Sequence, residues 1–213
     1  MFQRYFSQFR HTKNLTFQKI VSKICLSYAM YEKEWKALIK TIEDIELPSF
    51  DKILYSHELH KLLIAGEDHR FMYHRGVDII ALCRAVWRTF FCRRREGGST
   101  IAMQLVRVLT GKYEVTFTRK TLEIYLALRM TKYLPKEKII TLYLSVAYFG
   151  WNMNGIKQAI EELKYDPHNL SLREAASLIA RLKYPEPKSF SKRREKLINV
   201  RTDYILTRYE KLN

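Results

Sequence analysis

The chain has 213 residues, 47% of them hydrophobic, and a formal net charge of +16 at pH 7. This length and composition favour one good-sized globular domain over a disordered chain, and only 7 Gly and 5 Pro interrupt it. Such a positive charge predicts an anionic partner: nucleic acid, an anionic membrane surface or a phosphorylated substrate. Because Cys25, Cys83 and Cys92 lack paired spacing, we expect buried free thiols rather than a disulfide framework or a zinc site.

Two basic amphipathic helices are predicted in the first 30 residues, which contain five Lys or Arg and no acidic residue. Apolar side chains recur there at spacings of three and four residues, from Phe2 to Phe9 and again from Phe17 to Tyr28. The two apolar stripes either lie on an anionic membrane surface or pack on the domain. Pro48 marks a break, so we predict a basic helical segment at 1–50 and a second domain at 51–213.

After this break the sequence predicts a succession of helices joined by short loops. They are expected at 56–66, 77–91, 100–110, 118–134, 135–150, 171–182 and 192–212. Ser99 is expected to cap the third of them, which ends at Gly111, and Ser171 with Glu174 has the spacing of a capping box. Strand alternation and hairpin dipeptides are scarce, so we predict an all-α fold.

The stretch from residue 63 to 78 combines charged side chains with apolar ones. Glu67 ends a helical apolar stretch and lies beside aromatic residues. A half-buried carboxylate in such surroundings suits a general base or acid. The alternative is that Glu67 pairs with Arg70 or caps a helix.

Two later segments carry candidate anion-binding groups. Residues 97–100, Gly-Gly-Ser-Thr, precede a helix whose free backbone N–H groups attract phosphate or sugar oxygens, although they also suit a plain loop and N-cap. Arg119, Lys120 and Glu123 fall within about one helical turn. They form either an ordinary surface ion pair or a carboxylate flanked by cations beside an anionic leaving group.

The order and spacing of these segments resemble the peptidoglycan glycosyltransferases of family 51, which polymerise lipid II. The family pattern Glu-Asp-x-x-Phe-x-x-His-x-Gly is matched at Glu67, Asp68, Phe71, His74 and Gly76. Its Gly-x-Ser-Thr-Ile-x-Gln-Gln segment is matched at Gly97 or Gly98, Ser99, Thr100, Ile101 and Gln104, and its Arg-Lys-x-x-Glu motif at Arg119, Lys120 and Glu123. Segments 136–150 and 173–182 resemble further family motifs, so the likeness covers roughly residues 55–190.

The resemblance implies a lysozyme-like helical domain with a small membrane-facing lobe. Its activity would join a growing glycan, held by its lipid pyrophosphate, to the next lipid-linked disaccharide with inversion at the donor sugar. Glu67 would be the general base and Glu123 the second catalytic carboxylate, near the pyrophosphate and a divalent cation such as Mg²⁺ or Mn²⁺. The substrate-binding residues would be Asp68, Arg70, Phe71, His74, Ser99, Thr100, Gln104, Arg107, Arg119 and Lys120.

Some features depart from the family pattern. Met103 stands where the first of two glutamines is usual, Val115 where an Arg contacts phosphate, and Ser145 where Asn is usual. The family's transmembrane helix and its frequent transpeptidase domain are not recognised, and the first residues lack the features of an ordinary signal peptide. We therefore expect a peripheral protein on an anionic membrane surface, at the extracytoplasmic face of the inner membrane in which the family works.

Three other functions stay open on the sequence alone. A relative could act on another lipid-linked glycan, as the changes at Met103 and Val115 suggest. Two carboxylates also suit a lysozyme-like glycan hydrolase, although a neutral leaving group needs no cations near Glu123. The charge and 13% aromatic residues are compatible with a nucleic-acid-binding protein, but no such module is recognised and no nucleic-acid partner is expected.

Overall fold

The structure is a computed structural model, and it describes residues 28–46, 56–91 and 97–212. The chain divides into two compact units, Met1–Asp44 and Ile45–Asn213. Within the first unit residues 28–43 are helical, and they fall inside the basic helical segment predicted at 1–50. The apolar stripes that precede Tyr28 and the break at Pro48 lie outside the described residues, and the domain boundary at residue 50 stays a prediction.

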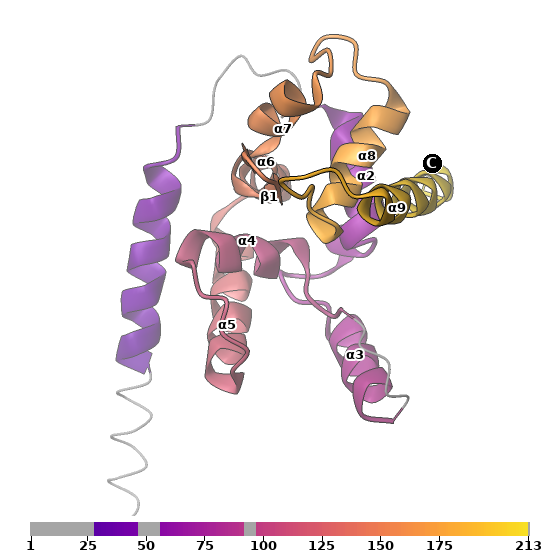
Figure 1. Cartoon of the computed structure of the whole chain (residues 1–213). Coiled ribbons are helices and arrows are strands. Elements are labelled where there is room, and N and C mark those ends of the chain that lie inside the picture. Colours follow the sequence, from indigo (N-terminus) through magenta and orange to yellow (C-terminus); the bar gives the residue numbers. More distant parts are fainter. Residues whose placement is uncertain (1–27, 47–55, 92–96, 213) are drawn as a thin grey trace, which may run out of the picture. The chain divides into compact units, whose positions relative to one another are not determined.

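The described part of the second unit is built almost entirely from helices (Figure 1). Its α-helices are α2 (His57–Glu67), α3 (Ile79–Phe91), α4 (Ile101–Thr110), α5 (Phe117–Tyr133), α6 (Lys136–Val146), α7 (Ile156–Leu163), α8 (Leu172–Lys183) and α9 (Lys192–Glu210). A 3-10 turn, η1 (Phe71–Tyr73), follows α2, and β1 (Tyr148–Gly150) pairs antiparallel with β2 (Met153–Asn154). The predicted all-α fold is confirmed, in keeping with the lysozyme-like domain that the resemblance implies.

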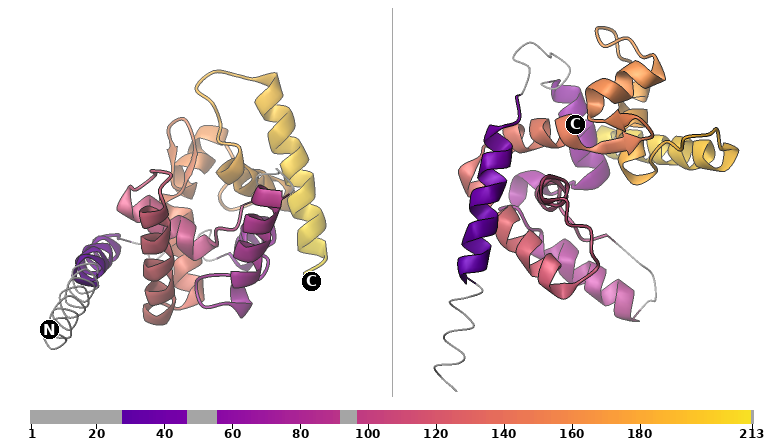
Figure 2. Two further views of the ribbon diagram at one scale, coloured as in Figure 1. Left: turned by 90° about the horizontal axis from the view of Figure 1, so that it is seen from below. Right: turned by 60° about the vertical axis from the view of Figure 1, so that its left-hand side comes forward.

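Two groups of packed helices enclose the core of this unit. α9 packs on α8 and on α2, while α4 packs on both α5 and α6 (Figure 2). Most apolar side chains of α4 are buried, among them Ile101, Met103 and Leu105, which are fully buried. Because so much of its surface is buried, α4 is a rigid element whose polar side chains, Gln104 and Arg107, face the same side.

Helix ends follow the local signals of the sequence, with one correction. The capping box is confirmed, because Ser171 Oγ accepts from Glu174 N at 3.3 Å and Ser171 N donates to the Glu174 carboxylate at 2.9 Å. α4 ends at Gly111 in the left-handed region, as predicted. The prediction that Ser99 caps α4 was wrong: Thr100 is the cap, and its hydroxyl accepts from Met103 N at 3.2 Å.

α3 stands away from the packed helices, and two glycines shape its connections (Figure 1). Gly76 has a φ of +90°, and a Cβ there would lie 2.4 Å from a backbone oxygen of α5, so this tight approach requires glycine. A Cβ on Gly98 would lie 2.9 Å from Ala85 Cβ of α3. Cys83 of α3 is exposed, so the expectation of a buried thiol was wrong there, whereas Cys25 and Cys92 lie outside the described residues.

Candidate active site

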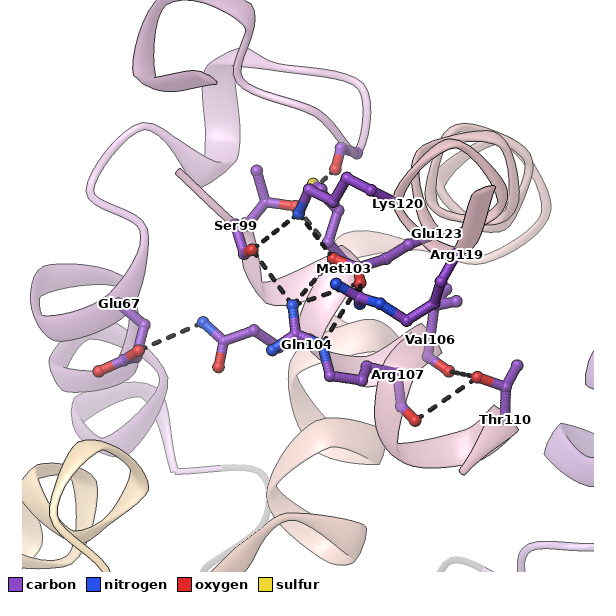
Figure 3. Close-up of polar contacts among 12 residues, drawn as sticks. Glu67, Ser99, Met103, Gln104, Val106, Arg107, Thr110, Arg119, Lys120 and Glu123 are labelled. Carbon is purple, nitrogen blue, oxygen red and sulfur yellow. Dashed lines mark hydrogen bonds and ion pairs between the residues drawn. The ribbon is translucent and has the colours of Figure 1, made fainter. Parts of the chain in front are cut away.

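The two predicted catalytic carboxylates lie on either side of α4 (Figure 3). Gln104 Nε2 donates to Glu67 Oε2 at 3.2 Å. One helical turn later, Arg107 Nη2 donates to Glu123 Oε1 at 3.0 Å. The spacing of three residues puts Gln104 and Arg107 on the same side of one rigid helix, and α4 therefore connects the two carboxylates.

Glu67 is the last residue of α2, and its side chain is only 13% exposed. Arg201 of α9 lies 3.1 Å from its Oε1 and also donates to the carbonyl of Gly66. The pairing with Arg70 that the sequence left open is not formed, since Arg70 instead lies 3.5 Å from Asp78. Sequence reasoning missed Arg201, because nothing in the basic pattern of α9 marks which of its cations faces residue 67.

Behind Gln104 lies a buried tyrosine that sequence reasoning also missed as a site residue. The Tyr143 hydroxyl of α6 donates to Gln104 Oε1 at 2.6 Å, and Tyr143 is 4% exposed. Burial, and then the negative charge of Glu67, raises the pKa of the Tyr143 phenol. The hydroxyl therefore stays protonated over the physiological range and can act as a donor.

Glu123 of α5 is the centre of a buried charge cluster. Its side chain is 3% exposed, and it accepts from Arg107, from Lys120 Nζ at 2.9 Å and from Arg119. Burial, and then the charges of Arg107 and Arg119, lowers the pKa of Lys120, while Glu123 acts in the opposite sense. The expectation of an ordinary surface pair does not describe this carboxylate, which is buried beneath its cations.

The cluster has a surplus of positive charge. Three cations surround one carboxylate, which leaves a formal charge of +2, and the cations are 15–30% exposed whereas Glu123 is not. Ser99, which does not cap α4, instead accepts from Lys120 Nζ at 2.9 Å and from Arg107 Nη2 at 3.3 Å. The partly exposed side of this cluster is consequently suited to binding an anion.

A cavity of about 620 Å³ opens beside Glu67 and extends to Ser99 and Arg107. Six cationic side chains line it against two carboxylates; the cations are Arg84, Arg88, Arg107, Lys183, Arg201 and Arg208. Burial, and then the charges of Arg208 and Arg84, lowers the pKa of His69, so this residue is neutral at neutral pH. The cavity therefore combines space for a ligand larger than a single small anion with a strong preference for negative charge.

Four predicted substrate-binding residues are packed into the protein. Asp68 accepts from Ile101 N at 3.2 Å, and His74 Nε2 lies 3.0 Å from both of its carboxylate oxygens. Thr100 donates to the carbonyl of Gly76 at 2.6 Å, and Phe71 is fully buried. Asp68 thus holds the start of α4, where the sequence predicted an anion site, and direct contact of these four residues with substrate stays a prediction.

The positions that depart from the family pattern have different surroundings. Met103 is fully buried, so its apolar side chain belongs to the core. Val115, in the loop between α4 and α5, is 98% exposed and supplies no charge there. Ser145 Oγ donates to the carbonyl of Leu142 at 2.8 Å, within α6.

The predicted divalent cation finds few ligands in the described part of the chain. No group of three or more His, Cys, Asp or Glu side chains converges within those residues. Glu123 already has three cationic partners, whose charges oppose the approach of a metal ion. The described residues therefore do not form a site for a resident metal ion, and a divalent cation near a bound pyrophosphate stays a prediction.

A family model described as "Transglycosylase" matches residues 35–210. The chain is 32% identical over 155 residues to "Penicillin-binding protein 1F" of Bacillus subtilis, which covers 68% of this chain and 22% of that protein. It is 38% identical over 105 residues to "Penicillin-binding protein 1A" of Escherichia coli; this match covers 49% of this chain and 12% of that protein. The chain therefore spans about a fifth or less of these curated relatives.

Proposed function

The chain belongs to the transglycosylase family, and from that premise we propose that it polymerises a lipid-pyrophosphate-linked disaccharide of the lipid II kind into glycan strands. One observation carries the proposal: α4 separates the carboxylate of Glu67 from the positively charged cluster around Glu123. Direct displacement of a pyrophosphate needs a base for the nucleophile and fixed positive charge for the leaving group.

In this mechanism Glu67 removes the proton from the 4-hydroxyl of the acceptor sugar. The freed oxygen attacks the anomeric carbon of the donor, where a new C–O bond forms as the bond to the pyrophosphate breaks with inversion. Negative charge collects on the leaving pyrophosphate, beside Arg107, Arg119 and Lys120. Glu123 is too buried to take a proton from a bound sugar, so we assign it the task of fixing those cations.

The remaining cations of the cavity fit the second substrate. Arg84, Arg88 and Arg208 line the cavity beside Glu67, outside the cluster around Glu123. The acceptor also carries a lipid pyrophosphate, and guanidinium groups bind phosphate oxygens in a bidentate manner. We therefore assign the donor pyrophosphate to the Glu123 cluster and the acceptor pyrophosphate to these arginines.

A lipid-linked substrate requires contact with a bilayer. No helix of the described residues is long and apolar enough to cross a membrane. α3 exposes five large apolar side chains, Ile79, Ile80, Val86, Trp87 and Phe91, with Trp87 stacked on Phe91 at 4.2 Å between ring centroids. We propose peripheral binding through this face and through the basic residues 1–30, at the extracytoplasmic face of the membrane.

The function is tested with purified lipid II in detergent, by measuring glycan polymer with the native chain and with Glu67→Gln. Gln keeps the shape of the side chain but cannot accept the proton, so polymer formation is expected to fall about 10²–10⁴-fold. Near-native turnover in a folded Glu67→Gln protein would contradict the assignment. Release of soluble fragments from sacculi without polymer formation would identify a hydrolase, and a preference for another lipid-linked glycan would redefine the donor.

A further inference from the structure

Three side chains from three different helices form a chain of hydrogen bonds that ends at Glu67. Tyr143 of α6 donates to Gln104 Oε1 at 2.6 Å, and Gln104 Nε2 of α4 donates to Glu67 Oε2 at 3.2 Å, at the end of α2. Gln104 and Glu67 line the cavity, whereas Tyr143 lies behind them in the core. Met103, where the family pattern has a glutamine, is fully buried and supplies no second amide.

The chemistry of the two ends fixes the direction of this chain. An ionised carboxylate only accepts hydrogen bonds, while a glutamine side chain has one accepting and one donating end. If the Gln104 amide were reversed, its carbonyl oxygen would face the Glu67 carboxylate, and two acceptors would meet without a proton between them. The ionised carboxylate therefore sets the orientation in which the NH₂ group faces Glu67, and the Tyr143 hydroxyl supplies the donor that the Gln104 carbonyl needs in this orientation.

We propose that Tyr143 is a positioning residue for the catalytic base: it holds the Gln104 amide with its NH₂ group toward Glu67 and thereby keeps the carboxylate in one orientation. This inference rests on the proposed function of Glu67. Both carboxylate oxygens then receive a donor, Gln104 at Oε2 and Arg201 at Oε1. Donors at both oxygens favour the charged form over the protonated form.

Removal of the Tyr143 hydroxyl has a consequence that depends on pH. In Tyr143→Phe the Gln104 carbonyl loses its donor, so the amide is held less firmly and its NH₂ group donates less well to the ionised Glu67. The variant therefore weakens the ionised form of the base relative to the protonated form, which is inactive. Activity should be lost at a higher pH than in the native chain as the solution is acidified.

Other charged and titratable groups surround the same cavity and are unchanged in this variant. They come from α3, α4, α8, α9 and the loop after α2, and they are Asp68, His69, Arg84, Arg88, Arg107, Lys183, Arg201, Tyr204 and Arg208. Tyr143→Phe removes no charge from this set. A shift of the acid side of the pH–activity profile (its acid limb) can therefore be assigned to the amide of Gln104 rather than to an altered electrostatic field in the cavity.

The test measures kcat and KM for lipid II between about pH 5 and 9 for the native chain, Tyr143→Phe and a control, Tyr165→Phe, which follows α7 away from the cavity. On the acid side, kcat of Tyr143→Phe should fall about 2- to 12-fold, the worth of one neutral hydrogen bond. The acid limb should move upward by about half to one pH unit. KM should stay the same, because Tyr143 does not line the cavity.

A double-mutant cycle separates positioning from general loss of structure. In a Gln104→Leu background the amide is absent, so Tyr143→Phe should have no further effect on kcat or on the acid limb. An equal effect in both backgrounds, a Tyr143→Phe profile identical to that of Tyr165→Phe, or a raised KM with unchanged kcat would overturn the proposal. If Tyr143→Phe does not fold, Gln104→Leu alone must still move the acid limb upward.

The proposed function and this inference fail in different ways. If the native chain makes no polymer, or if Glu67→Gln is as active as the native chain, the proposed function is wrong. If the native chain is active, Glu67→Gln is not, and Tyr143→Phe matches its control, only the positioning role is wrong.

Discussion

Glu123→Gln is the substitution that most directly tests whether the cluster on α5 is a buried anchor or a surface ion pair. Gln keeps the size of the side chain and one accepting oxygen, but it removes the negative charge that Arg107, Arg119 and Lys120 share. The formal charge of the cluster rises from +2 to +3. The three cations then repel one another around a neutral group that is almost fully buried.

The expected loss of stability follows from burial. Breaking a fully buried ion pair from one side costs about 3–5 kcal/mol, whereas an exposed pair contributes about 0–1 kcal/mol. The cations here are 15–30% exposed, so water compensates part of their charge. We therefore expect Glu123→Gln to lower the free energy of unfolding by about 2–3 kcal/mol, below the fully buried range but well above that of a surface pair.

Urea unfolding of the full chain measures this difference, with Glu162→Gln on the exposed side of α7 as the matched control. Raising salt from about 0.1 M to 1 M shortens the Debye length from about 10 Å to 3 Å and should reduce the loss in Glu123→Gln. Turnover of lipid II should fall despite the added positive charge, because the cations lose their fixed positions. A change under about 1 kcal/mol with native turnover would refute the idea of a buried anchor.

Two further predictions concern the charge of Lys120 and the binding of residues 1–30 to a membrane. Burial, and then Arg107 and Arg119, lowers the pKa of Lys120, so its charge is lost at a lower pH than that of an ordinary lysine. Donor affinity, measured as KM, should therefore weaken as pH rises, and Lys120→Arg should hold it constant to about pH 10 because Arg stays charged. A protein that lacks residues 1–30 should co-sediment less with anionic liposomes than the full chain at low salt, since each cation near such a surface contributes about 1 kcal/mol. Equal binding at low and high salt would leave the domain surface as the membrane contact.

Local signals in the sequence predict most helices of this chain, and they fail where elements are short. A hydroxyl before an apolar repeat locates the starts of α4 and α8 to within about two residues, and Gly111 locates the end of α4, because caps depend on neighbours in sequence. α7 has only eight residues, and the strands have three and two, which leaves too few positions for a period to appear. The predicted helix at 135–150 consequently ran through the end of α6 into β1.

The site also contains contacts between neighbours in sequence, which the sequence indicates, and contacts between distant residues, which it does not. The spacing of Lys120 and Glu123 indicates that they pair, but the same spacing occurs on an exposed surface, so the burial of Glu123 depends on packing of α4 against α5. Arg201 reaches Glu67 across 134 positions of sequence, and Tyr143 reaches Gln104 across 39. Such contacts have no local pattern. Tyr143 falls in the segment 136–150 that resembles a family motif, but nothing in the sequence places it near Gln104, and nothing selects Arg201.

Glu67 and Glu123 both contact side chains of α4. The buried residues around α4 therefore have a role in the proposed chemistry. Gln104 and Arg107 are held at a fixed separation because α4 is helical and is enclosed by α5 and α6. The position of that helix along its axis is set at its first turn, where Thr100 accepts from Met103 N and Asp68 accepts from Ile101 N. A shift of this turn would move the donor to Glu67 and the donor to Glu123 together. Asp68 is only 8% exposed, but it can therefore influence both the base and the leaving-group site through the backbone of α4.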